Sequence, residues 1–263
     1  MNIERRTDLF NWDGDKAAPR PAAAMICVRP DDNVGFELLL VQRPAGSTFA
    51  GGQFVFPGGK VAEQDAAGAE RLRQAGLHID DAPGDVDAQR WQGFAAAAVR
   101  ELYEETGLLP GIGEAAVLGE PVDIEAEDAF WEALDRVAPE LGTGVVAGWN
   151  NWITPVVIPV RFDTWFFVTM VPAGTEPKLH TTEVASGIWV HPADALRRAA
   201  KDVPMMFPTL RNLEQIAAIR TIEELLSFAR AFPKAPILPK VERDDAGFMS
   251  MRMPDFWPVP STE

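Results

Sequence analysis

Three glutamates, Glu101, Glu104 and Glu105, stand three and four residues apart in the segment that runs from Arg100 to Leu108. On an α-helix with about 100° per residue, these carboxylates share one face and the apolar side chains of the segment share the other. Like charges at positions i and i+4 destabilise a helix slightly, and a divalent cation would remove that repulsion. The pattern predicts a helix with one buried face and one acidic face.

The sequence before this helix changes how its acidic face is interpreted. For an isolated glutamate-rich helix, a solvated surface is the common explanation. Here residues 53–56, Gln-Phe-Val-Phe, read as a short strand, and residues 57–60, Pro-Gly-Gly-Lys, follow as a glycine turn. Asp87 is suited to begin the acidic helix as its N-cap, and Gly107 to end it as its C-cap. The order is therefore strand, glycine loop and acidic helix.

This order resembles the Nudix box, which is usually written G-x5-E-x7-R-E-U-x-E-E-x-G-U, where U is a bulky aliphatic residue. The matching residues are Gly59, Arg100, Glu101, Leu102, Glu104, Glu105, Gly107 and Leu108. Asp65 stands where the box has its first glutamate, and Arg100 follows it by 35 residues instead of eight, so roughly 27 residues are inserted. The second half of the motif is complete, and the first half is interrupted.

Other segments are similar to one branch of the superfamily, the coenzyme A and acyl-coenzyme A diphosphatases, in which an insertion within the box is a known feature. These segments are residues 38–43, 49–59, 152–155, 159–167, 183 and 188–189. The resemblance covers roughly residues 20 to 230. It implies an α+β fold, a Nudix-type α/β/α sandwich around a mixed sheet, with extra helices from insertions and from the C-terminal region.

The periodicity of the sequence suggests the same mixed architecture. Predicted strands cover residues 22–28, 36–42, 53–56, 150–160, 161–170 and 188–191, and predicted helices cover residues 67–75, 87–106, 125–137, 194–201 and 209–232. Pro155 and Pro159 restrict their strand to an edge position or a bulge. We expect an N-terminal arm over residues 1–20, a Nudix domain over 21–232 with the box insertion at 66–87, and an extended tail over 233–263.

The resemblance also implies a metal site and a catalytic set. Mg²⁺ or Mn²⁺ would be held by oxygen atoms of Gly58, Glu101, Glu104 and Glu105. The predicted catalytic residues are Arg100, Glu101, Glu104 and Glu183. Arg100 would hold the carboxylates in position, or would be a plain surface partner of Glu104. Glu183 would serve as a further ligand or general base from a loop, or would be an exposed loop acid.

Charge limits which partners the chain can have. The net charge is −15, from 24 Lys and Arg against 39 Asp and Glu, and it repels polyanions. The charge therefore disfavours nucleic acids and anionic membranes as partners. It also disfavours the function of an RNA-decapping enzyme. A phosphate group must therefore be bound by a local positive charge, either a metal cation or basic side chains. The alternative is that these basic side chains are solvated surface charges. The predicted substrate-binding residues are Arg43, Lys60 and Arg161.

Cysteine and histidine usage excludes other kinds of site. Cys27 is the single cysteine and lies in an apolar run, so neither a disulfide nor a thiolate metal cluster is available. The three histidines lack the spacing of a metal site. No apolar run reaches the roughly 18 residues of a membrane span, and the first residues lack an apolar stretch, so we expect a cytoplasmic protein.

The leading functional hypothesis is metal-dependent hydrolysis of a diphosphate linkage in coenzyme A or acyl-coenzyme A. One alternative substrate class is ADP-ribose or an NADH-type dinucleotide. A non-catalytic Nudix module that senses a nucleotide is an alternative of another class, against which the intact carboxylates argue. A homodimer is compatible with these expectations, and we expect the insertion to determine the substrate. The aromatic residues at positions 149, 152 and 165–167 are predicted as core, with adenine stacking or an acyl pocket as the alternative.

Overall fold

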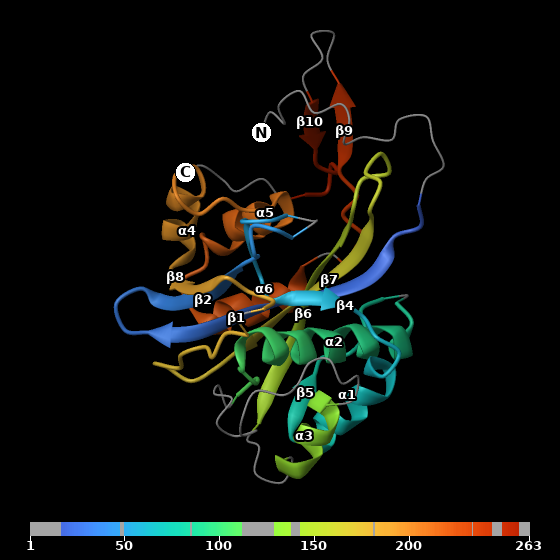
Figure 1. Cartoon of the computed structure of the whole chain (residues 1–263), viewed down its shortest axis with the longest axis vertical. Coiled ribbons are helices and arrows are strands. Elements are labelled where there is room, and N and C mark those ends of the chain that lie inside the picture. The colour runs from blue at the N-terminus through green and yellow to red at the C-terminus, as the bar shows by residue number, and fades with distance from the viewer. Residues whose placement is uncertain are drawn as a thin grey trace.

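A computed structural model of the chain describes residues 17–47, 50–84, 86–111, 129–137, 143–180, 182–232, 234–243 and 249–257. Within them an eight-stranded mixed sheet lies between two layers of helices (Figure 1). The main path of the sheet is β3-β2-β1-β7-β6-β5, with β4 paired to β1 and β8 paired to β2. This arrangement confirms the predicted α+β sandwich.

The main sheet and the helices around it have the following bounds in the described residues. The strands of the main sheet are β1 Arg20–Asp31, β2 Gly35–Gln42, β3 Phe54–Val55, β4 Gly58–Lys60, β5 Leu77–Ile79, β6 Gly144–Ile153, β7 Phe162–Met170 and β8 Ser186–Val190. The helices are α1 Asp65–Gln74, α2 Ala88–Thr106, α3 Ala129–Val137, α4 Pro192–Ala199, α5 Phe207–Ile216 and α6 Ile222–Ala231. None of the helices in the described part of the chain combines the length and hydropathy that a bilayer crossing requires.

The buried middle of strand β1, residues 22–28, is apolar because helices cover both faces of the sheet. Ala23, Met25 and Cys27 point into one core layer, and the residues between them point into the other. A turn joins β1 to β2, in which the Asp31 carboxylate accepts hydrogen bonds from the next backbone N–H groups. The predicted hairpin of these two strands is confirmed.

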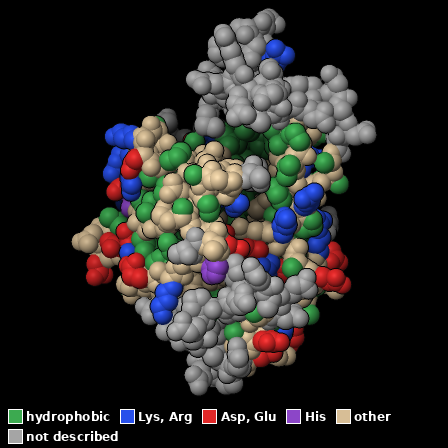
Figure 2. All heavy atoms as spheres, viewed as in Figure 1, with side chains coloured by type: hydrophobic (Ala, Val, Ile, Leu, Met, Phe, Trp, Pro, Cys, Tyr) green, Lys and Arg blue, Asp and Glu red, His purple; other side chains and the backbone are tan. Residues whose placement is uncertain are grey.

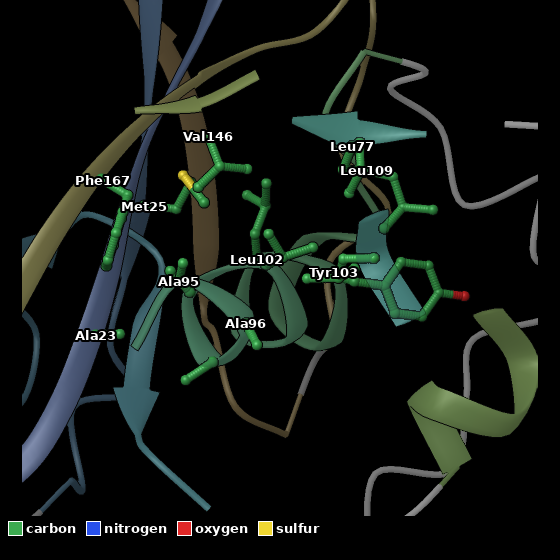
Figure 3. Packing of buried hydrophobic residues seen from close by; sticks show 14 of the residues in the cluster. Ala23, Met25, Leu77, Ala95, Ala96, Leu102, Tyr103, Leu109, Val146 and Phe167 are labelled. Carbon is green, nitrogen blue, oxygen red and sulfur yellow. The ribbon is translucent and has the colours of Figure 1, made fainter. Parts of the chain in front are cut away.

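Helix α2 occupies one face of the sheet together with α1 and α3 (Figure 1). The Asp87 carboxylate accepts a hydrogen bond from the Arg90 N–H at 2.8 Å, and Gly107 ends the helix at φ 69°. Both caps are those predicted from the sequence. Side chains on the buried face, such as Leu102, point toward Met25 and Val146 of the sheet (Figure 3).

The box insertion is built into the sheet. Its first part is helix α1, as predicted, which packs against α2 and α3. The second part, residues 76–87, was predicted as a loop, but it contains β5, which pairs in parallel with β6 and extends the sheet. Asp80, just after β5, accepts hydrogen bonds from Arg230 of α6, so the insertion is joined to a distant helix. Its influence on substrate choice remains a prediction.

Helices α4, α5 and α6 cover the opposite face of the sheet (Figure 1). The helical pattern over residues 209–232 resolves into two helices, α5 and α6. Trp149, Trp152 and Phe166 are buried under this layer, and Trp165 and Phe167 are buried under the α2 layer. All five aromatic residues belong to the core.

Residues beyond 232 contact the domain more closely than an extended tail would. Ile237 exchanges backbone hydrogen bonds with β6, and Trp257 packs on Trp152 with 5.3 Å between ring centroids. Between them, β9 Lys240–Arg243 and β10 Met249–Arg252 form a two-stranded sheet. The division into arm, domain and tail stays a prediction, and most of the predicted arm, residues 1–16, lies outside the described residues.

Candidate active site

Arg100 lies at the centre of a buried ionic network in the last two turns of α2. Its guanidinium donates hydrogen bonds to both carboxylate oxygens of Asp65, at 2.9 and 3.0 Å. It also donates to Glu101 at 2.9 Å, to Glu104 at 2.7 Å and to the backbone carbonyl of Lys60 at 2.9 Å. Burial alone would lower the pKa of Arg100, but the Asp65 hydrogen bonds and the surrounding carboxylates outweigh it and raise that pKa. The guanidinium is therefore a fixed positive charge that orients two of the three glutamates.

Asp65 takes the place of the first box glutamate despite the interruption of the motif. Its side chain is fully buried, and one of its oxygens also accepts a hydrogen bond from the Ala62 N–H at 2.7 Å. The chain leaves the site along α1, adds β5 to the sheet and returns along α2 to place Arg100 against Asp65. The sequence matched Asp65 to the motif but gave it no role. The sequence signal for this ion pair was a carboxylate just before the insertion, Asp65, and an arginine after it, Arg100.

The three glutamates lie in an environment that disfavours their negative charge. Burial, together with the charges of Glu104 and Glu183, raises the pKa of Glu101 to about 7, against the lowering effect of Arg100. Burial also raises the pKa of Glu104, and it raises that of Glu105 well above its usual range. The Gly58 N–H donates a hydrogen bond to Glu105 at 3.2 Å and offsets this only in part. A cation at this site would relieve the repulsion that remains.

The loop before β8 brings Glu183 to the same region. Backbone N–H groups of Lys178 and His180 donate hydrogen bonds to the carbonyls of Thr106 and Glu105, at 2.8 and 3.1 Å. These bonds use carbonyls that the end of α2 leaves unpaired, and they fix the loop to the helix. Glu183 is exposed, and its charge raises the pKa of all three glutamates. The structure thus places this loop acid beside the acidic helix, as the general-base prediction requires.

The three predicted substrate-binding cations lie in different settings. Arg43 follows β2, and its positive charge lowers the pKa of Glu105. Lys60 has an exposed side chain at the end of β4. Arg161 is largely buried and donates hydrogen bonds to the backbone carbonyls of Thr154 and Ala17. These bonds give Arg161 a structural role, and its contact with substrate stays a prediction.

Gly59 allows the carboxylate of Glu101 to lie directly against the glycine loop. A Cβ atom on Gly59 would fall 2.5 Å from the Glu101 carboxylate. We expect Gly59→Ala to displace Glu101 and to lower kcat by roughly 100-fold, the cost of a misplacement of about 1 Å, in steady-state assays. Gly46→Ala is the matched control because no atom lies within 4 Å of its added Cβ. Equal activity of the two variants would contradict this role for Gly59.

The donor set suits a hard divalent cation. Glu101, Glu104 and Glu105 offer carboxylate oxygens within two turns of one helix, and their raised pKa values show that a positive charge is favoured there. In the described part of the chain, however, no group of three or more His, Cys, Asp or Glu side chains is arranged to hold a metal ion as it stands. Glu101 and Glu104 point to Arg100 instead. The chemistry of the donors fits Mg²⁺ or Mn²⁺, and binding requires these side chains to turn.

Known proteins with similar sequences indicate the family of this chain. No family model matches the chain. It is 23% identical over 208 residues to the putative nudix hydrolase 7 of Caenorhabditis elegans, covering 77% of this chain and 62% of that protein. It is 26% identical over 261 residues to the acyl-coenzyme A diphosphatase NUDT19 of Homo sapiens, covering 80% of this chain and 68% of that protein. The chain therefore spans less than two thirds of the first of these relatives and little more of the second.

A solved structure agrees with these relatives. The crystal structure of a Nudix hydrolase from Alicyclobacillus acidocaldarius superposes with a TM-score of 0.66 at 26% identity, covering 82% of this chain and 99% of that one. The superposition extends over nearly all of the other protein, so the two proteins share the fold. The chain belongs to the Nudix hydrolase superfamily, and within it the chain resembles the branch of coenzyme A diphosphatases.

Proposed function

We propose that this protein is a metal-dependent diphosphatase that acts on coenzyme A or acyl-coenzyme A. The products would be a phosphopantetheine and adenosine 3′,5′-bisphosphate. The observation that carries the proposal is the network around Arg100, which holds glutamates against the glycine loop in spite of the insertion. The substrate class is supported by the similarity to the human acyl-coenzyme A diphosphatase.

In the proposed reaction, water attacks one phosphorus of the diphosphate and the bond from that phosphorus to the bridging oxygen breaks. Mg²⁺ or Mn²⁺, held by Glu101, Glu104, Glu105 and the Gly58 carbonyl, would neutralise phosphate charge and acidify the attacking water. Arg100 positions Glu101 and Glu104, and Asp65 positions Arg100. Glu183 accepts the proton of the water from the loop side.

Basic residues must bring the phosphates into a protein of net charge −15. The charge of Arg43 lowers the pKa of Glu105, and Lys60 is exposed at the end of the glycine turn. We assign both to the phosphates of the substrate, because a local cation can hold an anion that the mean field of the protein repels. A cytoplasmic location and a homodimer belong to the same proposal.

A chromatographic screen with Mg²⁺ and with Mn²⁺ tests the proposal. The substrates are coenzyme A, an acyl-coenzyme A, ADP-ribose, NADH and a dinucleoside polyphosphate. Release of adenosine 3′,5′-bisphosphate from coenzyme A is the expected result. Cleavage of ADP-ribose or NADH alone would assign another substrate. Nucleotide binding in calorimetry, without product after hours, would contradict the enzyme and favour a sensing module.

A further inference from the structure

Figure 2 shows acidic side chains gathered near the middle of the face on which α2 lies in Figure 1. Two connections between strands each bring one charge that acts on Glu105 of this helix. The connection from β2 to β3 carries Arg43, whose charge lowers the pKa of Glu105, and the loop from β7 to β8 carries Glu183, whose charge raises it. The last residue of β2, Gln42, lies where these two segments meet.

The backbone of Gln42 pairs on both edges of strand β2. Across one edge Gln42 pairs with Phe54 of β3, and across the other it pairs with Ser186, the first residue of β8. Its carbonyl also accepts a hydrogen bond from the Ala185 N–H at 2.8 Å. Strand β3 leads into the glycine turn, and β8 follows the loop of Glu183. The end of β2 therefore joins the two segments that flank the acidic helix in sequence.

The side chain of Gln42 adds a second link between the same segments. Its amide nitrogen donates a hydrogen bond to the Gly52 carbonyl at 3.0 Å, and its amide oxygen accepts one from the Ser186 hydroxyl at 2.9 Å. The Gly52 N–H in turn donates a hydrogen bond to the Arg43 carbonyl at 3.1 Å. Because one end of an amide donates and the other accepts, the two partners fix its orientation. One half-buried side chain thus connects the turn of Arg43 to the start of β8.

Glu183 lies between two anchored parts of its loop. Before it, two backbone N–H groups of the loop donate hydrogen bonds to carbonyls at the end of α2. After it, Ala185 and Ser186 are bound to Gln42. Glu183 itself is exposed, so its own side-chain packing does not hold it in place. A general base must stay within hydrogen-bonding reach of the attacking water, and the anchors on both sides can supply that precision.

We propose that Gln42 is a positioning residue for hydrolysis, which holds Glu183 where it can accept the proton of the attacking water. The inference rests on the proposed function, in which Glu183 is that base. The hydrogen bond with Ser186 holds the Glu183 side, and the hydrogen bond to Gly52 holds the Arg43 side. Loss of the first bond should therefore lower kcat alone. Loss of both should lower kcat and also raise KM, because Arg43 is assigned to the substrate phosphates.

Substitutions at the two ends of this link separate the effects in steady-state assays with coenzyme A. Ser186→Ala removes one bond and should lower kcat by about tenfold at unchanged KM, whereas Ser186→Thr keeps the hydroxyl and should retain most of kcat. Gln42→Met keeps the length of the side chain, removes both bonds, and should lower kcat by roughly 10- to 100-fold and raise KM. Gln92→Met is the matched control, because Gln92 is also half-buried and lies about two turns before Arg100 in α2. It should leave both constants unchanged, and thermal midpoints would check the fold of every variant.

A double-mutant cycle decides whether Gln42 acts through Glu183. Glu183→Gln alone should lower kcat by about 100-fold, the lower end of what a general base contributes. Adding Gln42→Met to Glu183→Gln should cost less than about a further threefold, because no base is left to position. Two losses that multiply would overturn the proposal. Unchanged kcat in Gln42→Met would also overturn it, since the buried Val184 would then suffice to hold the loop.

Amide hydrogen exchange separates this inference from the proposed function, because it needs no turnover. Exchange over residues 182–186 should be about fivefold faster in Gln42→Met, the effect of losing roughly one hydrogen bond, and unchanged in Gln92→Met. If coenzyme A is cleaved but Gln42→Met alters neither exchange nor kcat, the positioning role is wrong and the proposed function stands. If the unsubstituted protein cleaves no diphosphate, the proposed function and the role of Gln42 in hydrolysis are both wrong, even where faster exchange shows that Gln42 anchors the loop.

Discussion

Glu104→Gln should lower kcat/KM for the diphosphate substrate by at least about 100-fold. Substituting a residue that only supports a metal ligand costs about 10- to 100-fold, and Glu104 is predicted to be a ligand itself. The substitution keeps the shape of the side chain and removes the negative charge that a divalent cation requires. Arg100 retains its contacts with Asp65 and Glu101, so the fold should persist. Steady-state kinetics at saturating Mg²⁺, together with the thermal midpoint, would measure both effects.

Glu223→Gln provides the matched control for this experiment. Glu223 is an exposed glutamate in the first turn of α6, on the opposite side of the sheet from α2. Its substitution makes the same chemical change on a helix and should leave turnover unaltered. Unchanged turnover of Glu104→Gln with metal present would contradict the assignment of Glu104 as a ligand.

Asp65→Asn should lower the free energy of unfolding by about 3 kcal/mol, the lower end for breaking a buried ion pair. The loss is large because Asp65 is fully buried and the Arg100 side chain is only 9% exposed. It lies at the lower end because Glu101 and Glu104 still neutralise the guanidinium. Urea unfolding followed by circular dichroism would measure the change.

Asp202→Asn is the comparison for the buried pair. Asp202 pairs with Arg198 at 2.7 Å on the surface, where both side chains are roughly half exposed, and its loss should leave the free energy of unfolding almost unchanged. Asp65→Glu should recover part of the kcat that Asp65→Asn loses, because it restores the charge beside Arg100. Equal destabilisation by Asp65→Asn and Asp202→Asn, or no recovery of kcat, would show that Asp65 does not position the site.

The acidic helix could be predicted almost to the residue because its limits are local chemistry. Asp87 caps its first turn, and Gly107 adopts the left-handed conformation that ends it. The apolar run over residues 22–28 likewise indicated a buried strand, which β1 confirms. The spacing of the glutamates, together with the glycine turn, was enough to locate the candidate site.

The parts that escaped prediction depend on contacts between distant residues. Strand β5 has three residues, too few for a periodic signal, and it exists because it pairs with β6. The association of Ile237 and Trp257 with β6 likewise depends on tertiary packing. The contact between Asp65 and Arg100 spans the whole insertion, so no local pattern could have given its geometry.

The most direct test is anomalous diffraction from crystals soaked in Mn²⁺, since the central claim is that the glutamates of α2 bind a catalytic cation. The account predicts an anomalous peak bounded by the carboxylates of Glu101, Glu104 and Glu105 and by the Gly58 carbonyl. The Arg100 contact with Asp65 should be unchanged in that structure. A peak at another site, or none at α2 at saturating Mn²⁺ in an enzyme whose turnover requires Mn²⁺, would contradict it.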